Sequence, residues 1–210
     1  DNVSEFRVVD IKEDRNIIGF IEKPKQEEAP SDLINAGAYY LDPLVLDYIK
    51  KDELVSMEKE IFPQIIRDTG KFYGYKFDGY WMDIGRISSY LEVNKFLLDK
   101  KNMKNCIGKN LKNEGELTKT TVGNNVTIGK KSVLNQSIVL DNAQIKEDCK
   151  LSNCVIGERG VVGSYSNLKY TVLGDNEKTD ENTNLENKII WTQEKPKGYP
   201  DKQIGNVIEK

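Results

Sequence analysis

The amino-acid sequence predicts two structural parts, an α/β segment followed by a left-handed parallel β-helix. For the first part, two β-rich runs at residues 6–11 and 17–21 flank a polar turn, and amphipathic helical patterns follow them. For the second part, an aliphatic residue recurs at every fifth or sixth position over residues 122–174, often followed by Gly or Asn. That recurrence is typical of hexapeptide repeats, in which three short strands make one triangular coil of about 18 residues. The run is long enough for about three coils.

Each element of the α/β segment follows from a local pattern. The two β-rich runs predict a hairpin, and Asp42 and Pro43 supply an N-cap and a first-turn proline for a helix. Ser56 starts a second helix, which ends at Gly70, a residue suited to the position after a helix. The remaining predicted elements are strands at residues 33–41 and 71–78 and a helix from Ile87 onward.

Composition excludes several classes of protein. The 210 residues carry 31 Lys and Arg against 34 Asp and Glu, so no basic surplus points to nucleic acid. No run approaches the roughly 20 apolar residues of a membrane-spanning helix, and no signal-peptide pattern opens the chain. The three cysteines have no metal-type spacing and are expected to be reduced thiols in a cytoplasmic protein, with Cys149 and Cys154 buried in the repeats. Because histidine is absent, imidazole bases and imidazole metal ligands are excluded.

A first candidate binding site lies where the predicted hairpin ends. Pro24 cannot donate to a strand ladder, so the strand stops there and leaves Glu22 and Lys23 at its exit. Glu accepts hydrogen bonds from sugar hydroxyls, and Lys is a compact cation suited to a phosphate. Further along, Asn35 can bond a hydroxyl, and Gly37 allows close approach of a ligand. The alternatives are a solvated charge pair at the strand end and a bulge with a structural Asn.

A second candidate site is the stretch at residues 79–85, which reads Gly-Tyr-Trp-Met-Asp-Ile-Gly. An acid that follows aromatic residues and precedes a glycine is a common arrangement for a metal ligand near a bound molecule. Asp83 is therefore a candidate metal ligand, although one carboxylate does not hold a metal ion tightly by itself.

Four other polar residues on the predicted helices have structural interpretations. Glu58, Lys59 and Glu60 lie in the first turn of the helix that Ser56 starts, where they complement the helix dipole and carry surface charge. Asn94 falls on the apolar stripe of the helix that follows Ile87. A buried Asn needs hydrogen-bond partners, so we expect Asn94 to pin a neighbouring loop.

Composition also divides the chain into four stretches. Residues 1–100 form the α/β segment, and residues 101–120, rich in Lys, Asn and Gly, form a linker. Residues 121–175 form the β-helix, with aliphatic side chains inside and Gly or Asn at the corners, where a positive φ is easy. Residues 176–210 form a C-terminal tail. Because a short solenoid leaves unpaired strand edges at its ends, we expect a homo-oligomer.

Taken together, these motifs resemble the C-terminal part of a sugar-1-phosphate nucleotidylyltransferase, of the mannose-1-phosphate guanylyltransferase-like branch. The resemblance covers nearly all of the chain up to about residue 174, and four short motifs occur in the family's order ahead of the hexapeptide repeats. The matching motifs are residues 20–24, residues 35–37, residues 56–63, and residues 79–85 together with Tyr90.

The resemblance implies the C-terminal half of a Rossmann-like nucleotidyltransferase domain. Such enzymes transfer a nucleoside monophosphate from a nucleoside triphosphate to a sugar 1-phosphate and release pyrophosphate. Glu22 would then bind sugar hydroxyls and Lys23 the sugar phosphate, while Asn35 and Gly37 would line the sugar pocket. Asp83 would be one of two Asp ligands to Mg²⁺. No residue is assigned as a catalytic acid or base, since phosphoryl transfer depends on positioning and charge neutralisation.

The sequence departs from the family in two places. Arg86 and Ile87 stand where the family usually has Thr and Pro, which should change the entry of the helix more than the metal site. No glycine-rich nucleotide loop with its Arg and Lys occurs in the chain, nor does the family's first metal Asp. We therefore expect a fragment that is inactive alone and comes from an enzyme specific for mannose 1-phosphate or glucose 1-phosphate.

Two other functions compete with this interpretation. One is a non-catalytic regulatory or scaffolding relative, which would keep the fold and sense a nucleotide sugar. The other is a hexapeptide-repeat acyltransferase, which the absence of histidine argues against, since those enzymes usually deprotonate the acceptor with one.

Overall fold

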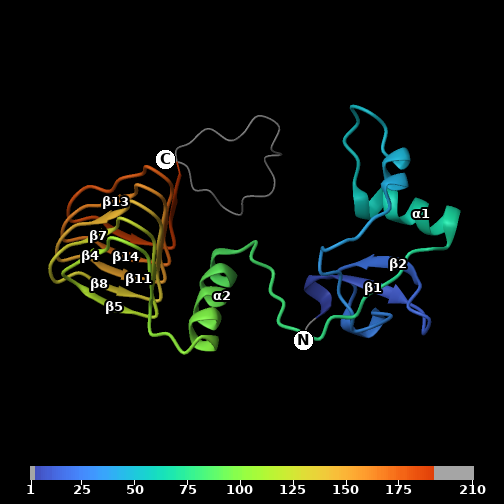
Figure 1. Ribbon diagram of the computed structural model, residues 1–210, viewed down its shortest axis with the longest axis horizontal. Helices are drawn as coiled ribbons and strands as arrows, with labels where there is room; N and C mark the ends of the chain where they lie inside the picture. Colours follow the sequence, from blue (N-terminus) through green and yellow to red (C-terminus); the bar gives the residue numbers. More distant parts are fainter. Residues whose placement is uncertain (1–2, 192–210) are drawn as a thin grey trace. The chain divides into compact units, whose positions relative to one another are not determined.

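The computed structural model describes residues 3–191, which fall into two compact units. The first unit is Asp1–Trp81 and the second is Met82–Lys210. Figure 1 shows a hairpin with short helices in the first unit, and a helix with a stack of short strands in the second. Among the described residues, no helix is both long and apolar enough to cross a membrane. Each unit is described by itself below.

The first unit is built around the antiparallel hairpin β1–β2, which confirms the predicted hairpin. The register places Arg7 opposite Glu22 and Val8 opposite Ile21, with an irregularity between Asp10 and Ile11. The elements of this unit are η1 (Val3–Glu5), β1 (Arg7–Ile11), β2 (Ile17–Glu22), η2 (Gln26–Glu28), η3 (Pro43–Tyr48), η4 (Met57–Ile61) and α1 (Phe62–Thr69).

The predicted helix at residues 56–70 is confirmed as η4, a single π-helical turn, running directly into α1. The Ser56 hydroxyl caps it by accepting from the Lys59 N–H at 3.2 Å, and the Glu60 carboxylate accepts from the Ser56 N–H at 2.9 Å. This reciprocal pairing satisfies N–H groups that a helix start leaves without partners. Gly70 ends α1 with a φ of 61°, the left-handed conformation expected there.

An aromatic cluster forms the core of the first unit. Phe62 is fully buried, with its ring centroid 4.8 Å from that of Tyr39 and 5.0 Å from that of Phe72. Phe20 of β2 completes the cluster, so α1 packs against the hairpin through rings. Such pairs add stability beyond the apolar area they bury.

Two predicted strands of the first unit are wrong. Residues 33–41 and 71–78 run without regular structure, and each makes one antiparallel bridge to the hairpin, Val8 to Ile34 and Asn16 to Tyr73. In the first, Gly37 has a φ of 74°, which turns the chain out of the extended conformation. In the second, Phe72 joins the core but Tyr73, Tyr75 and Phe77 are exposed, so no continuous buried face holds a ladder in register. The helix predicted at Asp42 and Pro43 is the short 3₁₀ helix η3, with Asp42 capping it.

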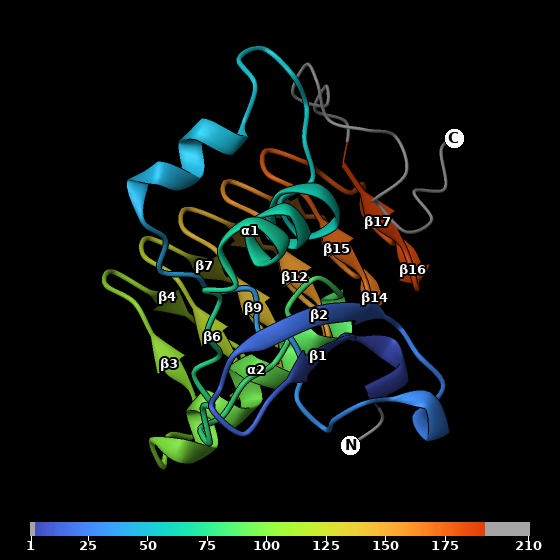
Figure 2. The same ribbon diagram turned by 90° about the vertical axis from the view of Figure 1, so that its right-hand side faces the viewer.

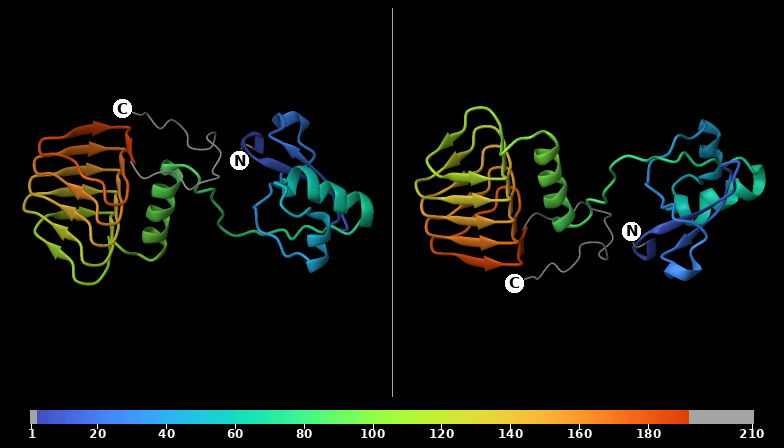
Figure 3. Two further views of the ribbon diagram at one scale, coloured as in Figure 1. Left: turned by 90° about the horizontal axis from the view of Figure 1, so that it is seen from above. Right: turned by 90° about the horizontal axis from the view of Figure 1, so that it is seen from below.

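The second unit is the helix α2 (Ile87–Lys100) and a parallel β-solenoid of about five coils. Figures 2 and 3 show the coils stacked with their strands in line. Three parallel sheets form its sides, ordered β13-β10-β7-β4, β16-β14-β11-β8-β5 and β17-β15-β12-β9-β6-β3. The strands are β3 (Cys106–Ile107), β4 (Lys112–Asn113), β5 (Glu116–Thr118), β6 (Thr121–Val122), β7 (Thr127–Ile128), β8 (Val133–Asn135), β9 (Ile138–Val139), β10 (Gln144–Ile145), β11 (Lys150–Ser152), β12 (Val155–Ile156), β13 (Val161–Val162), β14 (Asn167–Lys169), β15 (Val172–Leu173), β16 (Asn184–Glu186) and β17 (Ile189–Ile190).

The solenoid is longer than the sequence predicts. Its first three strands, β3 to β5, lie inside the stretch assigned to a linker, residues 101–120, and its last two lie inside the predicted tail, residues 176–210. The apolar pattern fades in these end coils, because the inward position of Ile128 in β7 is taken by Asn113 in β4. Atypical end coils are expected of repeat proteins. Residues 192–210 of the predicted tail lie outside the described residues, and the left-handed sense stays a prediction.

The coil repeat is 17 residues beyond the first coil, one fewer than predicted, and 15 residues separate β3 from β6 and β4 from β7. Positive φ angles recur at the corners, and Asn is the commonest residue there, as predicted. The prediction for Gly is wrong, because the solenoid glycines lack positive φ. They lie where coils approach closely instead: a Cβ on Gly157 would come within 2.5 Å of the carbonyl carbon of Gly174. The glycines are needed for space rather than for conformational freedom.

Small polar side chains line part of the solenoid interior in columns. In one column the Ser137 hydroxyl donates to the Asn135 carbonyl at 2.9 Å and accepts from the Cys154 N–H at 3.1 Å. In a second, the Ser132 hydroxyl accepts from the Cys149 N–H at 3.0 Å. Both cysteines are fully buried, as predicted, and burial raises the pKa of each thiol. The columns therefore satisfy backbone groups between coils as well as filling space.

The helix α2 is tied to the solenoid (Figure 2). The Thr121 hydroxyl of β6 donates to the Asn94 side-chain oxygen at 2.6 Å, so Asn94 holds a neighbouring segment as expected. Lys119 and Asp99 form an ion pair, and Leu98 is only 3% exposed. The helix is therefore part of the solenoid unit.

Candidate functional site

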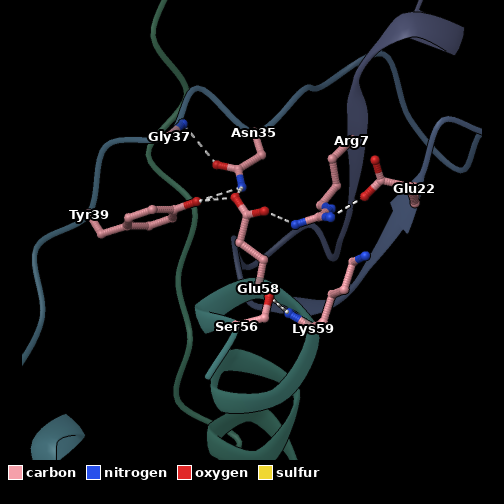
Figure 4. Close-up of polar contacts among 8 residues, drawn as sticks. All are labelled: Arg7, Glu22, Asn35, Gly37, Tyr39, Ser56, Glu58 and Lys59. Carbon is pink, nitrogen blue, oxygen red and sulfur yellow. Dashed lines mark hydrogen bonds and ion pairs between the residues drawn. The ribbon is translucent and has the colours of Figure 1, made fainter. Parts of the chain in front are cut away.

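The candidate site of the first unit is built where β1 and β2 meet η4. Arg7, at the start of β1, points its guanidinium between two carboxylates (Figure 4). One belongs to Glu22, the last residue of β2, and the other to Glu58 in η4. The register of the hairpin brings Arg7 and Glu22 together, because the two residues face each other across the ladder.

The loop after the hairpin adds an amide and a phenol to this cluster. The Asn35 Nδ2 donates to the Tyr39 Oη at 2.6 Å and to the Glu58 Oε1 at 2.8 Å, and the Tyr39 Oη also donates to the Glu58 Oε1 at 2.8 Å. At its other end, the Asn35 Oδ1 accepts from the Gly37 N–H at 3.0 Å. Figure 4 shows these side chains converging on Glu58. Asn35 is thus engaged within the chain at both ends of its amide.

Local structure explains why these side chains meet. The Asn35 N–H donates to the Arg7 carbonyl at 2.9 Å, which holds the loop beside β1. The Ser56 cap fixes the first turn of η4 and so fixes the position of the Glu58 backbone. Trp81 packs edge-on against Phe6, with ring centroids 5.5 Å apart, and its indole N–H donates to the Ala36 carbonyl at 3.3 Å.

Lys23 lies directly after the cluster in an uncommon backbone conformation. Its φ is 44°, a region that non-glycine residues rarely adopt, and its N–H donates to the Phe6 carbonyl at 3.1 Å. Such conformations are often found at functional sites. The side chain is exposed and contributes positive potential at Glu22.

The electrostatics of the cluster favour an ionised Glu22. The hydrogen bond from Arg7 is the largest influence lowering the pKa of Glu22, and the charges of Arg7, Lys59 and Lys23 act in the same direction. Burial raises the pKa of Glu22 by less than the Arg7 hydrogen bond lowers it, although by more than any one of the three charges does. Glu22 is therefore an acceptor-only carboxylate at neutral pH.

Asp83 belongs to the second unit, ahead of α2. It is exposed, and its Oδ1 accepts from the Gly85 N–H at 2.9 Å, which closes a local turn. Among residues 3–191, no group of three or more acidic or cysteine side chains could hold a metal ion. The described residues do not build a metal site by themselves, so the role of Asp83 as a ligand stays a prediction.

The structure thus brings together part of the predicted site and adds residues that the sequence did not reveal. Glu22 and Asn35 are joined through Arg7 and Glu58, which were not predicted site residues; nor was Tyr39. Arg7 could have been found from the hairpin register, which sets it opposite Glu22. Glu58 carries more than surface charge, but its partners lie 23 and 19 residues away in the sequence and leave no local pattern.

Comparison with known families finds a match for each of the two parts of the chain. Residues 1–100 match the model of the family described as Nucleotidyl transferase, and residues 115–202 match that described as GMPPB C-terminal domain. A mannose-1-phosphate guanylyltransferase of Mycobacterium tuberculosis is 27% identical over 157 residues, covering 69% of this chain and 43% of the relative.

Two further relatives share shorter segments at higher identity. The bifunctional protein GlmU of Methanocaldococcus jannaschii is 38% identical over 122 residues, covering 55% of this chain and 29% of the relative. A UTP–glucose-1-phosphate uridylyltransferase of Synechocystis is 34% identical over 98 residues, covering 47% of this chain and 25% of the relative. The chain thus spans less than half the length of each of these relatives.

Proposed function

We propose that this chain, a homologue of the sugar-1-phosphate nucleotidylyltransferases, contributes the sugar-phosphate site of an enzyme that joins a nucleoside monophosphate to a sugar 1-phosphate and releases pyrophosphate. The observation that carries the proposal is that Glu22 and Lys23 are adjacent at one strand exit, on a segment that matches the nucleotidyl transferase family. Glu22 accepts from sugar hydroxyls, and Lys23 binds the sugar phosphate.

The assigned chemistry suits these residues. In phosphoryl transfer the protein mainly orients the reactants and neutralises negative charge. Lys23 supplies a cation next to Glu22. No atom lies within 4 Å of where a Cβ on Gly37 would stand, so a ligand has room to approach the backbone there. Asn35 lines the sugar pocket in the proposal, although both ends of its amide are engaged within the chain. Neither recognition of the nucleotide base nor proton transfer is assigned to these residues.

The substrate class within the family is a finer proposal. Similarity to a mannose-1-phosphate guanylyltransferase over 157 residues supports mannose 1-phosphate, and similarity to a UTP–glucose-1-phosphate uridylyltransferase over 98 residues supports glucose 1-phosphate. The test offers both sugar 1-phosphates with each nucleoside triphosphate to the full-length protein, and the faster pyrophosphate release identifies the substrate.

A divalent metal is part of the proposed chemistry. We propose that Asp83 supplies one carboxylate ligand to Mg²⁺, with the remaining ligands outside the residues described here. Its second oxygen makes no hydrogen bond or ion pair among residues 3–191, so a ligand atom remains for a cation. The proposal predicts that the 210-residue chain is inactive alone, because the sequence contains neither the family's other metal-binding Asp nor a glycine-rich nucleotide loop.

Assembly and location complete the proposal. The end strands of the solenoid, β3 to β5, pair on one side only within the described residues, which supports a homo-oligomer that covers such edges. Three cysteines without a disulfide among them support a cytoplasmic protein.

A non-catalytic regulatory relative is the second candidate function. The observation that favours it is that Arg7 occupies Glu22 and that Asn35 is engaged at both ends, so part of the predicted sugar site is already paired within the chain. Catalysis and sensing differ in whether Asp83 is needed, since binding a nucleotide sugar does not require the metal acid.

The test is a pyrophosphate-release assay on the full-length protein with Glu22→Gln, Asp83→Asn and the control Glu53→Gln. Glu53 is in the first unit, and its only ion pair among the described residues is with Lys50. We expect Glu22→Gln to raise the KM for the sugar 1-phosphate, Asp83→Asn to abolish most turnover, and Glu53→Gln to change neither. Unchanged turnover in Asp83→Asn would refute the metal assignment and favour the regulatory relative.

A further inference from the structure

Arg7 is the least solvent-exposed residue of the charged group that it forms with Glu22 and Glu58. Its side chain is 15% exposed, whereas those of Glu22 and Glu58 are 51% and 35% exposed. The guanidinium touches one carboxylate from β2 and one from η4, so it bridges two elements that are far apart in the sequence. A cation buried under the acids it pairs with is suited to holding them rather than to meeting a ligand itself.

Glu58 has both oxygens committed within the chain. Its Oε1 accepts from Asn35 and Tyr39, and its Oε2 pairs with Arg7. Little acceptor capacity remains for a ligand. Glu58 thus acts on the site through Arg7 and Asn35, whose orientations it sets.

Glu22 has one oxygen committed and one available. Its Oε2 pairs with Arg7, while within residues 3–191 no hydrogen bond or ion pair uses its Oε1. A guanidinium presents its donors in a rigid fork, so a carboxylate bonded to it has a restricted orientation. The Oε1 atom of Glu22 therefore has a restricted orientation before any ligand binds.

We propose that Arg7 and Glu58 are positioning residues for sugar recognition: Glu58 holds Arg7 and Asn35, and Arg7 holds the Glu22 carboxylate with Oε1 turned to a hydroxyl of the sugar phosphate. This inference rests on the function proposed above. A side chain ordered in advance loses less conformational freedom on binding, and the affinity gained belongs to Arg7 and Glu58 although neither touches the sugar.

The charges around Glu22 give the proposal a pH signature. Arg7 from β1, Lys23 after β2 and Lys59 from η4 all lower its pKa, with Arg7 contributing most. Sugar binding needs the carboxylate and is lost as the pH falls through the pKa of Glu22. Removing Arg7 raises that pKa, so the loss then begins at a higher pH.

The experiment measures KM, kcat and pH profiles on the full-length protein with Arg7→Gln, Arg7→Lys, Glu58→Gln and Glu53→Gln. Losing an oriented charge-assisted hydrogen bond predicts a rise of about tenfold in the KM for sugar 1-phosphate. We expect this rise in Arg7→Gln and Glu58→Gln, with kcat and the KM for nucleoside triphosphate within about twofold of wild type. Arg7→Gln also moves the acid limb of the sugar kcat/KM to higher pH, and Arg7→Lys recovers part of both effects. Glu53→Gln matches wild type.

Comparison with Glu22→Gln separates failure of this inference from failure of the proposed function. If Glu22→Gln raises the sugar KM while the Arg7 and Glu58 variants leave KM and acid limb unchanged, the positioning role is refuted and the site assignment stands. If Glu22→Gln also leaves the KM unchanged, the sugar site lies elsewhere and the inference falls with it. Arg7→Lys keeps a cation for Glu22 and Glu58 and provides the measurement if Arg7→Gln does not fold.

Discussion

The hydroxyl of Ser137 offers a sharp test of what holds the solenoid coils together. Ser137 is fully buried, and its Oγ is the partner of the Cys154 N–H among the described residues, at 3.1 Å. Ser137→Ala removes that acceptor and leaves a buried N–H without a partner, which costs about 1–3 kcal/mol. The Asn135 carbonyl also loses the donor that lies 2.9 Å from it.

The measurement is the free energy of unfolding in urea, followed by far-ultraviolet circular dichroism of the 210-residue chain. Ser152→Ala is the matched control, because Ser152 is half-buried and, within residues 3–191, its Oγ bonds only the neighbouring Asn153 side chain, at 3.2 Å. We expect the control to change stability by less than about 0.5 kcal/mol. Ser137→Thr should stay near wild type, since Thr120 and Thr171 occupy equivalent places in the same column. Equal losses for Ser137→Ala and Ser152→Ala would refute the role of the column.

Two more outcomes test the solenoid. Gly157→Ala should lower the thermal midpoint by at least about 2–4 °C, the shift for 1 kcal/mol in a chain of this size, because the new Cβ meets the backbone of the next coil. Gly19→Ala is the control, since a Cβ there has open space, and equal midpoints for the two variants would contradict the close-approach role of Gly157. A thiol reagent should modify Cys106 in the native protein but reach Cys149 and Cys154 only on unfolding, because both thiols are buried and burial raises the pKa of each. Mass spectrometry counts the modified thiols, and rapid labelling of all three would argue against the packed interior.

The sequence was most informative where one local pattern decides the structure. Ser56 and Gly70 bracket a helix because capping chemistry is local. The solenoid follows from a period that only stacked coils can use. The ends of the solenoid could not be predicted in the same way. The inward position that Ile128 fills in β7 is taken by Asn113 in the first coil, so the apolar repeat in the sequence is shorter than the run of strands.

Predictions failed where a neighbour in space decided the structure. Residues 33–41 have β-rich composition, yet a strand needs a partner over its length, and the hairpin offers them a single bridge at Ile34. The candidate site shows the same limit. Glu22 stood out beside Pro24, but Glu58 is read as surface charge until η4 is placed against Arg7 and Asn35.

From the second coil onward, equivalent residues of successive coils are 17 residues apart, so a change of one whole coil leaves the stacking of the later coils unaltered. Excising residues 142–158 would join Asp141 to Arg159, and Arg159 occupies the same positive-φ corner one coil beyond Asn142. Every later side chain would keep its inward or outward direction. Excising one residue fewer would turn the following aliphatic side chains toward solvent. A deletion or insertion of one 17-residue coil therefore preserves the inward and outward directions of the later side chains in this part of the solenoid.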